Sequence, residues 1–326
     1  MWPRRPSPQE STSISWKRSR HRCTLTFFYF EVDSSLLGGE NISSMFAPVI
    51  RLVVITLFLL TGLSLWSFYS SIRPLKFTSP LTPRDLQMAY RDVSFKTADG
   101  LTLRGWYIPA LEATRKTLVL LHGYPADKGN ILPPLAFLHG EFNLLLFDFR
   151  YLGASEGNYS TAGAKEVEDL LAAVRYLKSR GNSEIGVWGF SMGGAVALMA
   201  LANAPEIRAV VSESSYASLG EMAFELFNIP LLKYPLAYLV HLWAQTFLGI
   251  DLREVSPAER VRGARIPILV IHSTADAVIP FSHAEKLRQG LANNPRAEFW
   301  FHDGFAHGQL GADYHSRIKK FFHKNL

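Results

Sequence analysis

Cysteine and charge are both scarce in this chain. A single cysteine, Cys23, stands among 326 residues, which excludes an internal disulfide and any metal site built from several cysteines. Only 19% of the residues are charged, whereas 48% are hydrophobic, so the chain is too apolar to be disordered and long enough to bury a substantial core. It also lacks internal repeats and low-complexity tracts. We therefore expect one large domain with extensions.

Clustered positive charge is scarce as well, although the formal net charge is +6. The one compact basic run, KRSRHR at residues 17–22, is typical of a solvated or membrane-proximal patch. Nucleic acid is therefore not an expected partner, and the sequence implies neither a metal ion nor an organic cofactor. The oligomeric state stays open.

One segment lacks charge altogether. Residues 52–72 read LVVITLFLLTGLSLWSFYSSI, long enough to cross the hydrocarbon layer of a bilayer, about 30 Å thick, as a helix. Trp66 and Tyr69 stand where an interfacial aromatic belt would lie. A buried soluble helix would usually keep a polar stripe, and no cleavage site of a signal peptide follows. We therefore predict a single transmembrane anchor over residues 49–72.

The side of the membrane on which the rest of the chain lies stays open. Arg51 precedes the apolar run while Arg73 and Lys76 follow it, so the positive-inside signal is divided. Residues 1–44 resemble no domain. Because Met45 stands just ahead of the apolar run, we expect it to be the physiological start and residues 1–44 to be an untranslated extension.

From residue 77 to residue 326, short apolar runs alternate with amphipathic stretches. Asp99 and Gly100 predict the turn of a β-hairpin, and residues 162–181 predict an amphipathic helix. Runs that are apolar at consecutive positions suit parallel strands covered on both faces. Such strands are expected at residues 117–123, 143–149, 184–190, 207–214 and 266–273. The alternation predicts a doubly wound α/β domain with a mostly parallel sheet.

Residues 219–250 break this alternation. They are strongly apolar, contain two prolines and are longer than a connecting helix needs. A second membrane-associated hairpin is one interpretation, but Glu221, Glu225 and Lys233 leave no clean spanning length. We therefore favour a short helical cap over the carboxyl edge of the sheet.

The sequence GFSMGG places Ser191 between Gly189 and Gly193. A predicted strand enters this motif and an apolar helix leaves it. The glycines permit a turn too tight for side chains, which would project the hydroxyl outward at a helix amino terminus, where negative charge is favoured. The motif alone is a weak signal, but its position between strand and helix predicts a nucleophile elbow with Ser191 as the nucleophile.

Five motifs, LLHGYP, DFRYLGASEG, GFSMGG, HSTADAVIP and DGFAHG, follow one another from Asp92 onward. In this order they resemble the alpha/beta-hydrolase superfamily, and within it membrane-anchored hydrolases of the serine-aminopeptidase-like or acyl-thioesterase-like kind. The resemblance implies a serine, an acid and a histidine in that chain order. Ser191, Asp276 and His307 satisfy it.

Each member of this set has an expected role. His307 takes the proton of Ser191 during attack and returns it to the leaving group, while Asp276 fixes the imidazole tautomer and stabilises the imidazolium. The backbone N–H groups of Tyr124 and Met192 are the expected donors of the oxyanion hole.

Alternatives exist for the acid and for the base. Glu213, at the end of a predicted strand, is the alternative acid. His302 and His272 lie within predicted strands, so both are expected to be packed or hydrogen-bonded. His122 precedes the oxyanion loop, which it is expected to brace.

The DFRYLGASEG loop departs from the superfamily, which usually has glycine where Tyr151 stands. This leaves any role inherited by the loop open. We expect Asp148 and Arg150 to form a structural ion pair at the end of the preceding strand.

The sequence thus predicts a membrane-anchored serine hydrolase that cleaves ester or thioester bonds of apolar acyl substrates through an acyl-enzyme. One alternative is a serine aminopeptidase, but only Glu221 and Glu225 in the cap could hold a free amine. A second is a non-catalytic binding protein on the same fold, which is disfavoured because the serine, acid and histidine are all present. The acyl length and the leaving group stay open.

Overall fold

The computed structural model describes residues 42–225, 227 and 230–326, with burial of side chains from residue 46 onward. The basic run at residues 17–22, Cys23 and most of the expected extension 1–44 lie outside the described residues. The chain divides into two compact units, residues 1–52 and residues 53–326. The larger unit carries the sheet and every candidate site residue.

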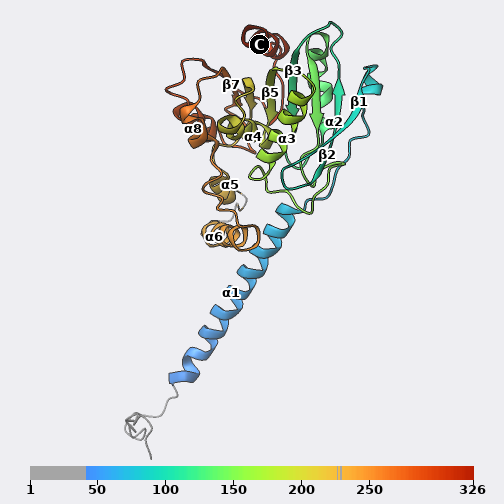
Figure 1. Cartoon of the computed structure of the whole chain (residues 1–326). Helices are drawn as coiled ribbons and strands as arrows, with labels where there is room; N and C mark the ends of the chain where they lie inside the picture. Colours follow the sequence, from blue (N-terminus) through green and yellow to red (C-terminus); the bar gives the residue numbers. More distant parts are fainter. Residues whose placement is uncertain (1–41, 226, 228–229) are drawn as a thin grey trace, which may run out of the picture. The chain divides into compact units, whose positions relative to one another are not determined.

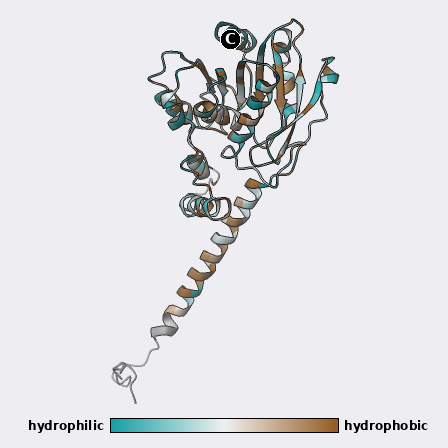
Figure 2. Ribbon diagram, in the orientation of Figure 1, coloured by the Kyte–Doolittle hydropathy of each residue, from teal (hydrophilic) through white to brown (hydrophobic). Residues whose placement is uncertain are grey.

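A long apolar helix, α1 (Ile42–Ile72), opens the described chain. Its stretch Phe46–Ile72 has a mean hydropathy of 2.2 and is, by length and composition, able to cross a membrane. Figure 2 shows this helix largely in the brown of hydrophobic residues. The expected apolar helix is therefore confirmed in length and composition.

The sheet confirms the expected mostly parallel α/β fold. Its strand order is β1-β2-β4-β3-β5-β6-β7-β8 (Figure 1). The pairs β1–β2 and β2–β4 are antiparallel, and all pairs from β4 to β8 are parallel. The strands are β1 (Arg91–Lys96), β2 (Thr102–Ile108), β3 (Lys116–Leu121), β4 (Asn143–Phe147), β5 (Glu184–Phe190), β6 (Ile207–Glu213), β7 (Ile268–Ser273) and β8 (Ala297–His302).

The predicted strands lie close to the observed ones. Strand β5 has the predicted bounds, while β3 and β4 each end two residues before the prediction, where the chain turns toward the site. The predicted hairpin joins β1 and β2 through Asp99 and Gly100. Gly100 has a φ of +90°, a left-handed conformation that glycine adopts without steric cost.

Helices cover both faces of the sheet. The residues of α3 (Glu166–Ser179), α4 (Met192–Ala200) and α8 (Phe281–Gly290) share one core with the sheet, and those of α2 (Lys128–Leu135) and α9 (Tyr314–Asn325) share another. Burial on both faces explains why the central strands are apolar at consecutive positions.

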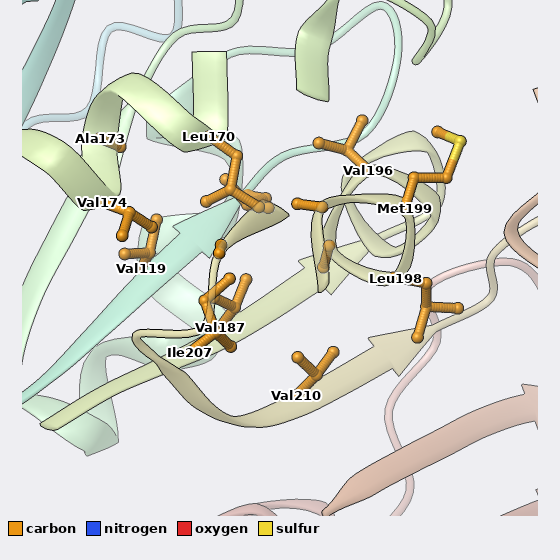
Figure 3. Close-up of a cluster of buried hydrophobic side chains, with 14 of the residues drawn as sticks. Val119, Leu170, Ala173, Val174, Val187, Val196, Leu198, Met199, Ile207 and Val210 are labelled. Atoms are coloured by element: carbon orange, nitrogen blue, oxygen red, sulfur yellow. The ribbon is translucent and has the colours of Figure 1, made fainter. Parts of the chain in front are cut away.

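Figure 3 shows part of the first core, where Val119 and Val187 of neighbouring strands meet Leu170 of α3 and Val196 of α4. The short α7 (Pro257–Arg260) precedes β7.

Helix α3 begins four residues later than predicted. The Glu166 carboxylate accepts hydrogen bonds from the hydroxyls of Ser160 and Thr161 and from the Gly163 N–H, at 2.5–2.8 Å. The segment before α3 therefore folds around this buried carboxylate instead of continuing the helix.

The segment expected as a cap contains α5 (Leu219–Glu225), α6 (Lys233–Trp243) and a short π-helix (Ala244–Leu248). It lies between β6 and β7 in the chain, so it leaves the carboxyl edge of the parallel strands. Its buried residues do not form a core of their own, because Phe68 of α1 is part of the same cluster.

The last three turns of α1 pack against this cap. Leu60, Ser64, Phe68 and Ile72, spaced four residues apart on one helix face, are buried or half-buried, and Trp243 Nε1 of α6 donates to Ser64 Oγ at 3.0 Å. The end of α1 is thus an integral part of the folded domain.

We predict that Phe68→Ala loosens the cap. Phe68 is only 5% exposed, and truncating a buried phenylalanine to alanine costs about 3 kcal/mol or more. Hydrogen exchange of the amides of α5 and α6 should become faster, while exchange in the central strands stays unchanged.

The matched control is Phe58→Ala, because Phe58 lies on the same helix with 76% of its surface exposed. Equal exchange rates in the cap for the two variants would show that Phe68 does not support the cap.

Candidate active site

Ser191 lies at a sharp turn between β5 and α4. Its backbone has φ +53° and ψ −118°, a left-handed conformation that is uncommon for residues other than glycine. The Ser191 N–H donates to the Glu213 carbonyl at 2.8 Å, which ties the turn to the end of β6. The chain thus makes the sharp turn between strand and helix that the motif predicts, and the role of Ser191 as a nucleophile stays a prediction.

The glycines of the motif have no room for a side chain. A Cβ at Gly189 would lie 2.3 Å from the Gly193 carbonyl oxygen, and one at Gly193 would lie 2.5 Å from the Leu121 carbonyl oxygen. Both distances are well below van der Waals contact with backbone atoms. The first α4 turn thus packs directly on its own strand and on β3.

Asp276 and His307 form a hydrogen-bonded pair. His307 Nδ1 lies 2.7 Å from Asp276 Oδ2, and Asp276 Oδ1 accepts the N–H groups of Val278 and Ile279, both at 2.9 Å. Burial alone would raise the pKa of Asp276, but the hydrogen bonds from His307 and Ile279 outweigh it and lower the pKa. The carboxylate is an oriented anion, and it directs the Nδ1 proton toward itself, which leaves Nε2 as the acceptor.

Phe190 brings the pieces of the site together. Its ring lies 4.7 Å from the His307 ring, centroid to centroid, and a Cβ at Gly308 would lie 2.9 Å from it. On the other side, a Cβ at Gly123 would lie 3.1 Å from Phe190 Cδ1 and 3.2 Å from Ser191 Cβ. The loop that carries His307 and the loop after β3 therefore both pack on Phe190, the residue that precedes the serine.

Within the described residues, no hydrogen bond joins the Ser191 hydroxyl to His307. Such bonds are often long in substrate-free sites and tighten when substrate binds. Phe190 is not among the site residues expected from the sequence. Its position directly before the serine, at the end of a strand, is the feature that could have indicated its contact with the site.

The alternative acid, Glu213, belongs to a different network. Tyr314 donates its hydroxyl proton to Glu213 Oε2 at 2.5 Å, and Trp188 Nε1 donates to the Tyr314 oxygen at 2.9 Å. Burial raises the pKa of Glu213 to about 7, and the hydrogen bond from Tyr314 only partly opposes this rise. The carboxylate bonded to His307 is therefore that of Asp276.

The alternative histidines are packed, as expected. His272 is buried and its Nε2 lies 2.9 Å from the Ile279 carbonyl oxygen, whereas Asp276 Oδ2 is 3.8 Å away. The ring of His302 packs on Trp300 and Phe305. Burial lowers the pKa of both histidines, which favours their neutral forms.

His122 braces the loop after β3, as expected. Its Nε2 accepts the Phe149 N–H at 3.1 Å, so Nδ1 carries the proton, and Nδ1 lies 2.7 Å from the Gly123 carbonyl oxygen. The loop after β3 is thereby fixed to the end of β4. Tyr124 follows Gly123, whose Cβ would lie 3.2 Å from Ser191 Cβ, and Met192 is the first residue of α4 directly after Ser191. The role of their N–H groups as oxyanion donors stays a prediction.

The expected ion pair between Asp148 and Arg150 is wrong. Asp148 is bonded to Lys128, whose Nζ lies 2.6 Å from Oδ2, and Arg150 is bonded to Asp169 at 2.7 Å and to Asp99 at 2.9 Å. Each side chain is instead paired with a residue from another part of the chain, Asp148 with Lys128 in α2 and Arg150 with Asp169 in α3. Both remain structural residues, because both are buried in these bonds.

Tyr151 connects its loop to the segment that follows α1. It has a φ of +67°, its hydroxyl donates to the Pro74 carbonyl at 2.9 Å, and Lys76 Nζ lies 4.9 Å from its ring centroid. The tyrosine that replaces the usual glycine therefore holds the chain as it leaves the long helix.

Tyr124 makes a parallel connection. Its hydroxyl donates to the Ser71 carbonyl in the last turn of α1 at 2.5 Å, and burial raises its pKa to about 12, so it stays a donor at neutral pH. The Ser160 N–H donates to the Ile72 carbonyl at 2.8 Å. The final carbonyls of α1 are thus bonded to loops around the site.

Comparison with known proteins identifies the family. A family model described as the alpha/beta hydrolase fold matches residues 116–248. The uncharacterized protein YfhR of Escherichia coli K12 is 31% identical over 223 residues, which cover 65% of this chain and 72% of YfhR. The chain belongs to the alpha/beta-hydrolase superfamily.

Further relatives of this hydrolase cover most of its length. The alpha/beta hydrolase domain-containing protein WAV2 of Arabidopsis thaliana is 26% identical over 272 residues, 79% of this chain and 85% of WAV2. Among solved structures, the Pyrococcus furiosus esterase Pf2001 is 28% identical with a TM-score of 0.66, covering 78% of this chain and 99% of the esterase. Within the part of the chain that the structure describes, no group of three or more His, Cys, Asp and Glu side chains is placed to hold a metal ion.

We predict that Gly193→Ala destabilises the hydrolase by about 1–3 kcal/mol, the usual cost of forcing an extra methyl group into packed surroundings. The added Cβ would displace the Leu121 carbonyl from its place in β3. Thermal unfolding followed by circular dichroism measures the effect.

Gly263→Ala is the control, because a Cβ at Gly263 meets no atom within 4 Å. If both variants unfolded at the wild-type temperature, the turn would not be as tightly packed as the structure shows it.

Proposed function

We propose that this protein is a membrane-anchored serine hydrolase that cleaves ester or thioester bonds of apolar acyl substrates. The observation that carries the proposal is the hydrogen bond between His307 and Asp276, in a chain that also places Ser191 at a strained turn. The two features together match the nucleophile, base and acid of a serine hydrolase.

In the proposed first half-reaction, Ser191 Oγ attacks the carbonyl carbon of the substrate while His307 Nε2 takes its proton. Asp276 stabilises the imidazolium that forms. The carbonyl oxygen becomes an oxyanion, and the N–H groups of Tyr124 and Met192 donate to it. The amino terminus of α4 adds a favourable field at the same point.

The tetrahedral intermediate then collapses. The bond from carbon to the leaving oxygen or sulfur breaks, His307 protonates the leaving group, and the acyl chain remains on Ser191. In the second half-reaction, His307 takes a proton from water, the hydroxide attacks the acyl-enzyme, and the carboxylic acid leaves as Ser191 regains its proton.

The membrane part of the proposal depends on α1. Its stretch Phe46–Ile72 meets the length and composition of a span. Its last turns carry Trp66 and Tyr69, and Arg73 follows directly, all residue types typical of a membrane interface. We propose a single-pass protein whose catalytic domain, expected from residue 77 onward, also includes the last turns of α1, which pack on the cap. The esterase Pf2001 supports an ester substrate by similarity.

The aminopeptidase remains the alternative, and one observation counts against it. The Glu221 carboxylate is bonded to Lys286 at 2.5 Å, so it already has a cation as partner and is a poor site for a substrate amine. A panel of nitrophenyl esters, acyl thioesters and aminoacyl amides of graded length distinguishes the substrate classes.

We predict that a fluorophosphonate probe labels the wild-type protein at Ser191. An activated serine reacts with such probes, whereas an ordinary hydroxyl does not. Ser191→Ala should abolish labelling, and His307→Ala should reduce it to a similar floor, because the residues act as a unit. Labelling is read by in-gel fluorescence and by mass spectrometry of the modified peptide.

The control variant is Ser316→Ala, which removes an exposed serine and should label as the wild type does. Folded protein that stays unlabelled would favour a non-catalytic binding protein on this fold.

We predict that Asp276→Asn lowers kcat by about 10⁴-fold, the usual effect of losing the tautomer-fixing carboxylate of a triad. Glu213→Gln should leave turnover within a few-fold of the wild type. Steady-state kinetics on a soluble nitrophenyl ester gives both values, and the reverse order of losses would assign the acid to Glu213.

Glu213→Gln also has a stability readout. Between the ordinary pKa of 4.5 and the raised value of about 7, the folded wild type binds a proton that the unfolded chain releases. Its free energy of unfolding therefore falls as pH rises through this window. The Gln variant should lack this decline, which a structural role predicts and a catalytic role alone does not.

A further inference from the structure

Helix α6 is apolar on both sides. Leu236, Ala237 and Val240 are buried against α5 and α1, as expected for the inner face of a cap. The opposite face carries Tyr234 and, four residues on, Tyr238, which are 52% and 65% exposed. A helix on the surface of a soluble protein usually presents polar residues there, so the function of this outer face needs an explanation.

The exposed apolar surface extends beyond α6. We call it the outer cap face. Its members are Leu231, Tyr234, Tyr238, Leu242 and Phe247, each about half or more exposed. Lys233 lies beside it, with Nζ 5.3 Å from the Tyr234 ring centroid. Groups of exposed apolar side chains on one element commonly mark contact with a membrane or another molecule.

The outer cap face meets the apolar surface of α1 at Phe247. A groove of about 600 Å³ is lined by Leu65, Trp66 and Tyr69 of α1 and by Phe247 of the cap. The rings of Phe68 and Phe247 stack at 6.2 Å. Lipid or water around the carboxyl-terminal turns of α1 would therefore also contact Phe247 of the cap.

The length of α1 places the cap at membrane depth. A span of about 20 residues that begins at Phe46 would reach Leu65, and the cap contacts α1 from Leu60 to Ile72, a rise of about 18 Å. The cap is packed against this part of the helix (Figure 1). A bilayer that surrounds α1 would therefore meet the cap at its headgroup boundary or slightly below it.

We propose that the outer cap face is inserted in the interfacial layer of the same bilayer that α1 spans. The proposal rests on the membrane part of the proposed function and is independent of the hydrolytic chemistry. Tyrosines at both i and i+4 suit this layer, since each has an apolar body and a polar tip. Lys233 would reach the lipid phosphates. The hydrolase is then held by two contacts, which fix the orientation of its carboxyl edge toward the membrane.

The test uses a depth-sensitive fluorophore on the full chain. Cys23→Ser and Ser191→Ala provide a cysteine-free, inactive background, and Tyr238→Cys is labelled with nitrobenzoxadiazole. The protein is reconstituted in phosphatidylcholine vesicles whose acyl chains are brominated close to the headgroup. We expect brominated lipid to quench most of the emission relative to unbrominated vesicles.

The matched control is Leu111→Cys with the same label. Leu111 is 76% exposed and follows β2, whose carboxyl end pairs with the beginning of β4, at the edge of the sheet opposite to the cap. Its label should keep its emission in both kinds of vesicle.

Each other outcome has a definite meaning. A label at residue 238 that is as unquenched as one at residue 111 would overturn the proposal. A label that is shielded but unquenched, and becomes exposed on dilution of the protein, would assign the face to a second copy of the chain. Flotation with the vesicles reports separately on α1, so loss of the span and loss of cap insertion are distinguishable.

Discussion

The contact between the first turn of α4 and the end of β3 is the constraint on which the site depends. Gly193 lies against the Leu121 carbonyl so closely that no side chain fits. This approach fixes Ser191 at its strained φ and places the loop after β3, with Gly123, against the serine side chain. A wider turn would separate the nucleophile from the N–H donors proposed to stabilise the oxyanion, because those donors come from the two segments that this contact joins.

A second constraint connects the site to the long helix. The hydroxyls of Tyr124 and Tyr151 donate to carbonyls of Ser71 and Pro74, at and just beyond the end of α1. Helix ends leave carbonyls without partners inside the helix, and here the loops around the site satisfy some of them. Tyr124 carries one of the proposed oxyanion N–H groups in its backbone, and its side-chain hydroxyl donates to α1 at Ser71. The position of the helix end and the shape of the site are therefore coupled.

Local patterns predicted most of the fold and the central residues of the site. Consecutive apolar residues predicted the parallel strands, and the order of motifs placed Asp276 and His307 together. The partners of Asp148 and Arg150 could not be predicted in this way, because Lys128 and Asp169 come from other parts of the chain. The contact of Phe68 with the cap could not be predicted for a related reason. Within an apolar helix, nothing in the sequence marks the face that α5 and α6 cover.

The cap has a structural consequence for substrate entry. Its inner residues pack against Phe68 of α1, so an apolar wall for the proposed acyl substrate would have to come from the first residues of the cap. There, Leu219 and Met222 pack in one cluster with Ile279, whose N–H donates to Asp276. The first helix of the cap and the loop that carries Asp276 therefore share a small apolar cluster. A change in the position of the cap would act on the Asp276 loop through these contacts. The cap, which we propose to face the membrane, is thereby connected to Asp276 and His307, the proposed catalytic pair.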